Sequence, residues 1–406
     1  MAVVIKGSGS IEGSTGLEMG ANGTTEIRGQ VNVAVGSSVA GVSTATNFAP
    51  TLIPTSNRNL IINGDFKIAQ RSTSKAITGY GYHTVDRFHT VANSSMSYAV
   101  TMSQETDGPS GFEKCVKLLT TSASTPTGSH NYTLRTTLEA GTIRQLGWGT
   151  SDSKASVLSF WVKSNKTGTY TSQIYIKGQS STVSMTVAYT ISSSATWEKK
   201  TISIPAYTTS LDMQTTHTNG GCTIDWGLAS GPDDITSAFS WAVQSAAKAV
   251  TGQVNLLDTV NNYWQLTGVQ FEVGEQATPF EHRSYGEDLR RCQRYYYLAA
   301  SGADAYQNNR APICTSANYS ATHAFGVVYF PVNMRTIPSN ASVEGTDYFR
   351  CFGNGNSDTF DSVSLQSAST QSFTIQFYGN LSRTAGSGSW IETENSATRI
   401  AFKAEL

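Results

Sequence analysis

Apolar and polar residues alternate through most of this chain, and the alternation predicts β-strands. From Thr267 onwards, Val269, Phe271 and Val273 point to one side of an extended segment and polar residues point to the other. This two-residue period is typical of a half-buried strand. The apolar residues before Gly268 fall on the opposite parity, so we expect a β-bulge at that glycine.

The same alternation recurs at even intervals between residues 57 and 284, separated by polar turns. The strands it predicts there are Ser97–Met102, Lys114–Leu119, His130–Leu138, Val157–Lys163, Thr169–Lys177, Thr182–Tyr189, Lys199–Ile204 and Trp264–Val273. Eight antiparallel strands without helices between them bury one face each by stacking two sheets. Residues 57–284 are therefore expected to form a β-sandwich, with a jelly roll as the preferred topology.

A short helix is predicted directly after this block, over residues 285–298. Ser284 and Glu287 have the spacing of a capping box, in which each side chain bonds a free backbone amide. Cys292 and Tyr296 follow at helical spacing. The helix is expected to connect two domains, with Tyr295, Tyr296 and Tyr297 packing domains or subunits together.

Residues 299–406 again show strand patterns, now with glycine-rich loops between them. The clearest predicted strands are His323–Phe330, Ser342–Phe349, Ser372–Tyr378 and Arg399–Ala404. We expect a smaller β-sandwich whose outer loops are exposed.

Residues 1–56 differ from the rest in their frequent glycines and near absence of aromatic residues. Their short apolar pieces are too small to bury a core, because ordering each backbone residue costs about 1 to 2 kcal/mol. The segment is expected to attach or oligomerise the chain, either disordered alone or ordered against other chains. The expected fold class is thus all-β: an extended N-terminal segment, a central sandwich, a connector helix and a smaller C-terminal sandwich.

Charge and cysteine content narrow the function classes. The chain has 28 Lys and Arg against 29 Asp and Glu, a net charge of −1, so the basic face of a nucleic-acid binder is not expected. The sequence also predicts neither a signal peptide nor a membrane-spanning segment. The five cysteines lack metal or redox spacing and are expected to be small buried hydrophobic residues in a protein made in a reducing cytoplasm.

Catalytic patterns are not found. None of the six histidines lies in a motif of nucleophilic or metal-dependent hydrolysis, and no spacing selects a facing carboxylate pair of the kind that a glycosidase needs. The sequence therefore predicts a binding protein and no enzyme, with no catalytic residues.

Three segments together point to a family. They are Tyr263–Arg294, which contains L-T-G-V-Q-F-E-V-G, A-T-P-F-E-H-R-S-Y and C-Q-R; Asn59–Phe66 with Asp86–Phe88 after it; and Phe330–Pro338. In order and spacing they resemble segments of tail fibres of tailed bacteriophages. The resemblance spans about residues 57 to 340. It implies a virion structural protein, assembled in the host cytoplasm and trimeric as tail fibres generally are.

The central block also looks like a second family. Its Asn-Gly-Asp-Phe start, the Ser159–Lys163 strand and the closing Leu266–Glu272 strand resemble galactose-binding-like jelly rolls of carbohydrate-binding modules. In that family the first and last strands lie together. A structural calcium ion is often held where they meet, which would place it near Asn63, Asp65 and Glu272.

Sugar recognition uses exposed aromatic rings beside amides and carboxylates. Aromatic residues at inward strand positions are expected in the core, so turns and polar loops supply the better candidates. The candidates for glycan binding are Trp148, Trp226, Tyr319, Tyr348, Phe352 and Trp390.

The expected function is that of a phage tail fibre. Residues 1–56 would attach it to tail or adaptor proteins of the virion, and the C-terminal block would bind host cell-surface polysaccharide. Three alternatives stay open at this stage: a decoration fibre mounted on the capsid, a tailspike enzyme that degrades polysaccharide, and a free carbohydrate-binding module of a cell-wall enzyme.

Overall fold

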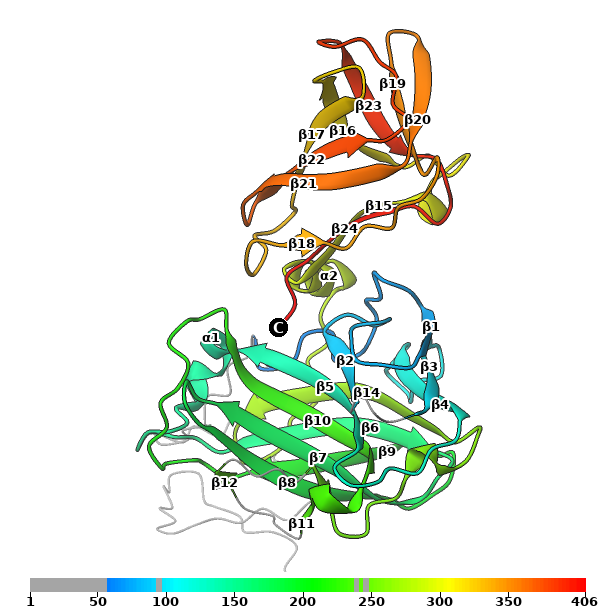
Figure 1. The fold of residues 1–406 in the computed structure, drawn as a ribbon. Helices are drawn as coiled ribbons and strands as arrows, with labels where there is room; N and C mark the ends of the chain where they lie inside the picture. The colour runs from blue at the N-terminus through cyan, green and yellow to red at the C-terminus, as the bar shows by residue number, and fades with distance from the viewer. Residues whose placement is uncertain (1–56, 93–96, 237–240, 244–247) are drawn as a thin grey trace, which may run out of the picture. The chain divides into compact units, whose positions relative to one another are not determined.

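The computed structural model describes residues 57–92, 97–236, 241–243 and 248–406. The fold class is all-β, as predicted: strands in several sandwich-like sheets are the main secondary structure of the described residues, and the helices are few and short (Figure 1). The N-terminal segment expected over residues 1–56 lies outside the described residues. No helix in the described ranges is long and apolar enough to cross a membrane.

The first sandwich consists of two six-stranded antiparallel sheets. In spatial order the first sheet contains β1 (Ser74–Ile77), β3 (Ala99–Glu105), β4 (Cys115–Ser122), β14 (Tyr263–Val273), β6 (Ser156–Ser164) and β9 (Glu198–Ile204). The second sheet contains β12 (Ala242–Val243), β8 (Thr182–Ile191), β7 (Gly168–Lys177), β10 (Gly220–Ser230), β5 (Asn131–Glu139) and β2 (Phe88–Ala92). All eight strands predicted for this region are present, with small shifts at their ends.

Short elements join these strands. They are α1 (Ala140–Ile143), the 3₁₀ turns η1 (Arg144–Leu146), η2 (Pro232–Asp234) and η3 (Leu256–Asp258), and a two-residue parallel pair of β11 (Ile235–Thr236) with β13 (Ala249–Val250).

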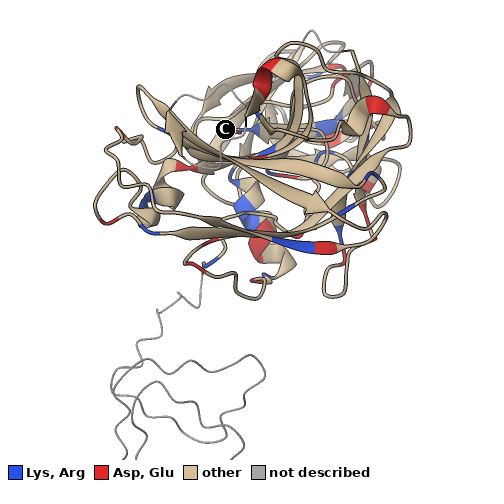
Figure 2. Cartoon of the chain, turned by 90° about the horizontal axis from the view of Figure 1, so that it is seen from below, with Lys and Arg blue, Asp and Glu red and all other residues tan. Residues whose placement is uncertain are grey.

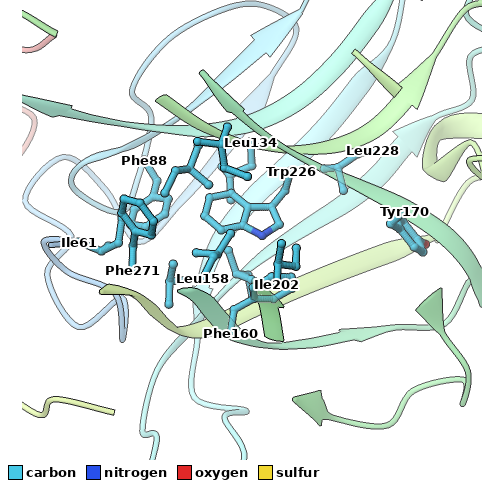
Figure 3. Close-up of a cluster of buried hydrophobic side chains, with 14 of the residues drawn as sticks. Ile61, Phe88, Leu134, Leu158, Phe160, Tyr170, Ile202, Trp226, Leu228 and Phe271 are labelled. Carbon is cyan, nitrogen blue, oxygen red and sulfur yellow. The ribbon is translucent and has the colours of Figure 1, made fainter. Parts of the chain in front are cut away.

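The core of the first sandwich lies between its two sheets (Figure 3). Phe160 of β6 in one sheet contacts Trp226 of β10 in the other, with ring centroids 5.9 Å apart, and Phe88 of β2 lies 6.1 Å from the same indole. All three side chains are fully buried. Burial of a large aromatic side chain stabilises a fold by about 2 to 3 kcal/mol, so this cluster is a main source of stability.

The last strand of this sandwich changes partner at Gly268. β14 pairs with β4 only up to Leu266, and its register with β6 shifts between Thr267 and Gln270. Gly268 has φ +61°, which glycine adopts without steric cost, so the predicted bulge is confirmed. Beyond the bulge, the segment that begins at Asn59 replaces β4 as the neighbour of β14. The Leu60 N–H donates to the Phe271 carbonyl at 2.8 Å, so the first and last parts of the sandwich do lie together.

The predicted connector helix is present as α2 (Tyr285–Gln293). Ser284 caps it, because its hydroxyl accepts a hydrogen bond from the Glu287 N–H at 3.3 Å. The helix is shorter than the predicted range of 285–298. From Tyr296 onwards the chain is strand β15 (Tyr296–Ser301), whose first residue pairs with Lys403. Pairing with a distant strand therefore overrides the local helical spacing that includes Tyr296.

The C-terminal block contains two sheets and the 3₁₀ turn η4 (Gly302–Asp304). The smaller sheet consists of β15, β24 (Arg399–Lys403) and β18 (Ser339–Asn340). The larger sheet contains, in spatial order, β20 (Asn356–Phe360), β19 (Phe349–Gly353), β23 (Gly388–Thr393), β16 (Pro312–Asn318), β17 (His323–Tyr329), β22 (Ser372–Tyr378) and β21 (Ser362–Ala368).

The seven-stranded sheet curls strongly. β20 and β21 lie at its opposite edges, yet only Asp361 separates them in the chain. The ring of Phe360 at the end of β20 lies 5.4 Å from that of Phe377 in β22, the strand beside β21. The concave side therefore encloses the second hydrophobic core, and the convex side faces outward.

One C-terminal strand prediction is wrong. Residues 342–349 were expected to form a strand, but β19 begins only at Phe349. The Tyr348 N–H donates to the Gly345 carbonyl at 3.2 Å, which closes a turn in the middle of the predicted range. The Gly-Thr-Asp sequence at this turn favours that geometry over an extended chain.

Candidate functional site

Two of the six predicted glycan-binding residues are buried. Trp226 was expected in an exposed Asp-Trp-Gly turn, but it lies in the middle of β10 and points into the core, fully inaccessible. Its neighbours Asp225 and Gly227 are paired strand residues. The local turn signal is therefore overridden by the antiparallel pairing of β10 on both sides, and the placement of Trp226 at an exposed turn is wrong.

Trp148 also turns inward, although it does lie between two glycines in a loop. Gly147 and Gly149 have φ +61° and +82°, and this backbone directs the indole into the sandwich. Its ring lies 6.0 Å from Phe271 and 5.8 Å from Trp241, and only 2% of the residue is exposed. The expected exposure of Trp148 is therefore also wrong, and it belongs to the core.

Phe352 and Trp390, in contrast, lie side by side on the outer face of the seven-stranded sheet. They are directly opposite each other in the pairing of β19 with β23, and their ring centroids are 4.4 Å apart. Trp390 is 45% exposed and Phe352 is half-buried. Residues at odd and even positions of a strand face opposite sides, so Phe349 and Cys351 point into the core while Phe352 points outward.

A charged pair lies two residues along the same two strands. Arg350 pairs with Glu392 across β19 and β23, with Arg350 Nη1 3.3 Å from Glu392 Oε2. The Arg350 guanidinium lies 5.1 Å from the centre of the Phe352 ring, and Trp390 Nε1 donates to Glu392 Oε1 at 2.8 Å. The carboxylate thus holds both the indole and the guanidinium in place. We refer to Arg350, Phe352, Trp390 and Glu392 as the Trp390 surface.

Hydroxyl groups flank the two rings. Ser357 of β20 pairs with Phe352, and Thr315 of β16 pairs with Trp390, so one row across four strands reads Ser, Phe, Trp, Thr. Both hydroxyl residues are exposed. The row therefore presents a flat apolar centre bordered by hydrogen-bonding groups, and a guanidinium and a carboxylate lie in the next row.

Arg350 and Glu392 were not predicted as site residues. The sequence does hold a signal for them, because each stands two positions from a predicted aromatic residue and so shares its face of a strand. What the sequence does not contain is the register of β19 against β23, which brings the two pairs together.

The remaining predicted aromatics lie apart from these four residues. Tyr319 is 78% exposed in the turn between β16 and β17, with its ring 5.5 Å from that of Phe325. Tyr348 is partly buried against the C-terminal core. Tyr319 thus remains an accessible ring, whereas Tyr348 mainly contributes packing.

Tyr295, Tyr296 and Tyr297 contact both parts of the chain that the connector joins. The Tyr295 hydroxyl donates to Glu139 of the first sandwich at 2.7 Å, whereas the Tyr297 ring stacks 6.4 Å from Phe402 of β24. Burial raises the pKa of Glu139, but hydrogen bonds from Arg294 and Tyr295 outweigh it, so the net pKa is lowered and the group stays ionised. Packing between subunits remains a prediction.

The residues predicted to hold calcium do not fit a shared site. The Asn63 amide already bonds three backbone groups, with its oxygen accepting from Ile68 N–H. The Glu272 carboxylate accepts from the Thr278 N–H and hydroxyl at 2.9 and 2.6 Å. Asp65 lies 2.9 Å from Lys67 Nζ, a cation that would repel a metal ion. Asn63 and Glu272 therefore serve as structural hydrogen-bonding groups, and Asp65 forms an ion pair with Lys67.

The five cysteines are free thiols, and four of them are buried. Burial raises the pKa of the fifth, the half-buried Cys314, to about 12, so it remains protonated at neutral pH. The expectation of small hydrophobic side chains is confirmed. In the ribbon of Figure 2, basic and acidic positions are interspersed among uncharged ones.

No protein-family model matches the chain, and no curated protein matches its sequence. Several solved structures do match. A putative sugar binding protein from Bacteroides thetaiotaomicron is 13% identical over 53% of this chain and 100% of that chain, with a TM-score of 0.30. The enzymatically active domain of tailspike protein 4 from bacteriophage CBA120 is 12% identical over 53% of this chain, with a TM-score of 0.29. This match spans only 22% of the tailspike chain.

A third match is a family 11 carbohydrate-binding module from Clostridium thermocellum in complex with a β-1,3-1,4-mixed-linked tetrasaccharide. It is 11% identical over 50% of this chain and 98% of that chain, with a TM-score of 0.25. Similarity at this level does not establish a shared function.

Proposed function

We propose that this chain is a glycan-binding structural protein of a virion, a tail fibre of a tailed bacteriophage, and that its Trp390 surface binds host polysaccharide. The observation that carries the proposal is the cross-strand pair of Phe352 and Trp390, 4.4 Å apart on an outward-facing sheet. The apolar face of a sugar ring stacks on an exposed aromatic ring of this kind.

The neighbouring polar groups complete the match to a sugar. The Arg350 guanidinium has five donors, and Glu392 accepts, so between them they can bond hydroxyl groups of either orientation. The two groups are held by their mutual contact, and the Glu392 carboxylate also accepts a hydrogen bond from Trp390 Nε1. Little side-chain entropy is therefore lost on binding, which favours affinity.

The assignment to a tail fibre rests on the three sequence segments that resemble that family. Attachment through residues 1–56, a homotrimeric state and location in the virion tail belong to the same proposal. Three copies of a weak site on one fibre would bind a repetitive polysaccharide with high avidity. Binding without cleavage is also part of the proposal.

The test measures binding of the full chain to oligosaccharides from the host surface by titration calorimetry. Trp390→Ala and Phe352→Ala are each expected to weaken binding at least about tenfold, the effect of losing roughly 1.4 kcal/mol of contact energy. Tyr306→Ala is the matched control, because Tyr306 is 95% exposed and has no contact with the Trp390 surface. Unchanged affinity in both aromatic variants would overturn the proposed site.

Two further measurements test the rest of the proposal. Native mass is expected to correspond to three chains, and a monomer would favour a free carbohydrate-binding module. A density map of the assembled particle is expected to show the chain on the tail; density on the capsid would identify a decoration fibre instead. Release of short oligosaccharides from the polysaccharide would contradict binding without cleavage.

A further inference from the structure

A cavity of about 850 Å³ opens beside the ends of β1 and β24, away from the Trp390 surface. Its walls come from three stretches of chain: the turn at Tyr80–His83, residues 335–342 around β18, and the final residues from Lys403 onward. Arg71 also lines it, as does Tyr296 of β15. The volume lies within the range of small-molecule sites, which is about 300 to 1,000 Å³.

Aromatic rings form one wall of this cavity. Tyr80 is 62% exposed and its ring meets His89 edge-on at 5.4 Å, while Tyr82 lies 4.5 Å from the same imidazole. The Arg71 guanidinium lies 3.7 Å from the centre of the Tyr296 ring and 5.2 Å from that of Tyr82. These contacts fix the buried rings and leave Tyr80 accessible to a ligand.

The charged groups of the lining do not balance. Arg71, Arg335 and Lys403 are basic, and Glu405 is the acidic side chain among the lining residues. The Glu405 carboxylate already pairs with Arg71 and with Arg87 behind the cavity wall. Lys403 is exposed and forms no ion pair within the described residues. Arg71 also pairs with buried Asp86, with Arg71 Nη1 3.2 Å from Asp86 Oδ1. The surplus of positive charge in the lining therefore rests on Lys403 and Arg335.

Arg335 shows this surplus most clearly. Its Nε, Nη1 and Nη2 atoms donate to the backbone carbonyls of Ala404, Thr218 and Glu405 at 2.7, 2.8 and 2.6 Å. Within the described ranges no carboxylate forms an ion pair with it. Burial lowers its pKa by more than the nearby carboxylates of Glu139 and Glu405 raise it.

We infer that this cavity binds an anionic sugar residue, one that carries a carboxylate, sulfate or phosphate group. The anion would lie between Lys403 and Arg335, with the apolar face of the ring against Tyr80. The choice of a sugar rests on the proposed function, whereas the choice of an anion rests only on the uncompensated charge of the lining. The cavity thus adds a second, charge-selective subsite to the fibre.

The test compares binding of the full chain to a trigalacturonate, to the neutral trigalactose, and to sulfated and phosphorylated forms of the same sugar. Wild-type protein is expected to bind at least one anionic form more tightly than the neutral form, with an affinity that falls as salt rises. The anionic form with the highest affinity identifies the acid group. Equal binding of neutral and anionic forms would overturn the inference.

Lys403→Gln and Tyr80→Ala are the test variants, because both side chains are exposed. Each is expected to weaken binding of the preferred anionic form about three- to tenfold. Lys199→Gln, an exposed lysine on β9, is the charge-matched control and should bind like wild type. Undiminished binding in both test variants would also overturn the inference.

Trp390→Ala separates this inference from the proposed function. It is expected to weaken binding of neutral host glycans and to leave binding of the acidic probe at Lys403 unchanged. If the acidic probe does not bind while the Trp390 dependence holds, the cavity inference fails alone. If Trp390→Ala has no effect on any glycan, the proposed function fails instead.

Discussion

Arg87 is buried in the first sandwich and its guanidinium donates a hydrogen bond to Glu405, 318 residues further along the chain. The same guanidinium donates to the Thr137 carbonyl at 2.6 Å and lies 3.4 Å from the centre of the Tyr295 ring. The Arg87 side chain therefore contacts the first sandwich, Tyr295 at the end of the connector, and Glu405, which follows β24 in the chain.

Glu405→Ala is expected to destabilise the protein by about 3 to 5 kcal/mol, because it leaves the buried Arg87 without its counter-ion. The measurement is the free energy of unfolding in urea. Glu394→Ala is the control: its partner Arg310 lies at 2.9 Å in a more exposed ion pair, so we expect a much smaller loss. Equal losses in the two variants would show that the Arg87 pair does not hold the parts together.

The contrast between Arg87 and the strands shows what the sequence can predict. Strands such as β6 and β7 were predicted closely, because the pattern of apolar and β-branched residues that predicts them is local, although both strands are buried on both faces. An ion pair between Arg87 and Glu405 has no local signal at all, since it depends on how distant elements pack. The same limit explains why β15 replaced the end of the predicted helix.

The same limit explains why only part of the candidate site could be predicted. Phe352 and Trp390 stand in polar, glycine-flanked stretches, so their exposure could be inferred individually. Their contact depends on the pairing of β19 with β23, which no short stretch encodes. Trp226 was misplaced because Asp-Trp-Gly resembles a turn, while the sheet supplies pairing partners on both sides that make it a central strand.

Gly64 is expected to tolerate no side chain. A Cβ there would lie 2.1 Å from the Val269 carbonyl oxygen, a backbone atom that β14 holds in place. Gly64→Ala should therefore cost about 2 to 3 kcal/mol, measured as a lower midpoint of urea unfolding. Gly286→Ala in α2 is the matched control, because nothing lies within 4 Å of its added Cβ.

Gly286→Ala is expected to leave the free energy of unfolding unchanged or to raise it by up to about 1 kcal/mol, since alanine favours a helix more than glycine does. If Gly64→Ala unfolds at the wild-type midpoint, the segment from Asn59 does not lie against β14 as the structure has it.

His89 is expected to make stability depend on pH. Burial, together with the nearby charges of Arg135 and Arg87, lowers its pKa from 6.5 to about 3. The unfolded chain therefore binds a proton at His89 below pH 6.5, whereas the folded protein binds it only below about pH 3. Stability consequently falls as the pH falls through this window. At pH 4.5 the loss relative to pH 8 is roughly 2 to 3 kcal/mol.

His89→Gln should remove the part of the stability loss that His89 causes at low pH. His217 is exposed, so His217→Gln should lose stability with pH as wild type does. The comparison with wild type matters because Asp86 acts in the opposite direction. Burial raises the pKa of Asp86 to about 6, so the folded protein protonates this carboxylate at a higher pH than the unfolded chain does. Asp86 therefore adds stability as the pH falls from about 6 to 4. The measurement is the free energy of unfolding in urea at several pH values. If it falls by the same amount in wild type and in His89→Gln between about pH 8 and 4.5, the role of His89 is contradicted.

Substitution of Trp226 is expected mainly to reduce stability, and substitution of Trp390 mainly to reduce glycan binding. Trp226→Ala opens a large cavity between the two sheets and should cost about 3 to 5 kcal/mol. Trp226→Phe should cost less than half of that, because it keeps an aromatic ring and because the buried Trp226 Nε1 has no hydrogen-bond partner to lose. Urea unfolding measures both losses.

Trp390→Phe, in contrast, should change stability by less than about 0.5 kcal/mol, since the side chain is half-exposed on the outer face. It should nonetheless weaken glycan binding, because the smaller ring no longer donates to Glu392 and covers less of the sugar. Trp226→Phe should leave glycan binding unchanged. A Trp226→Phe variant that folds normally but loses binding would mean that the first sandwich, and not the Trp390 surface, holds the main glycan site.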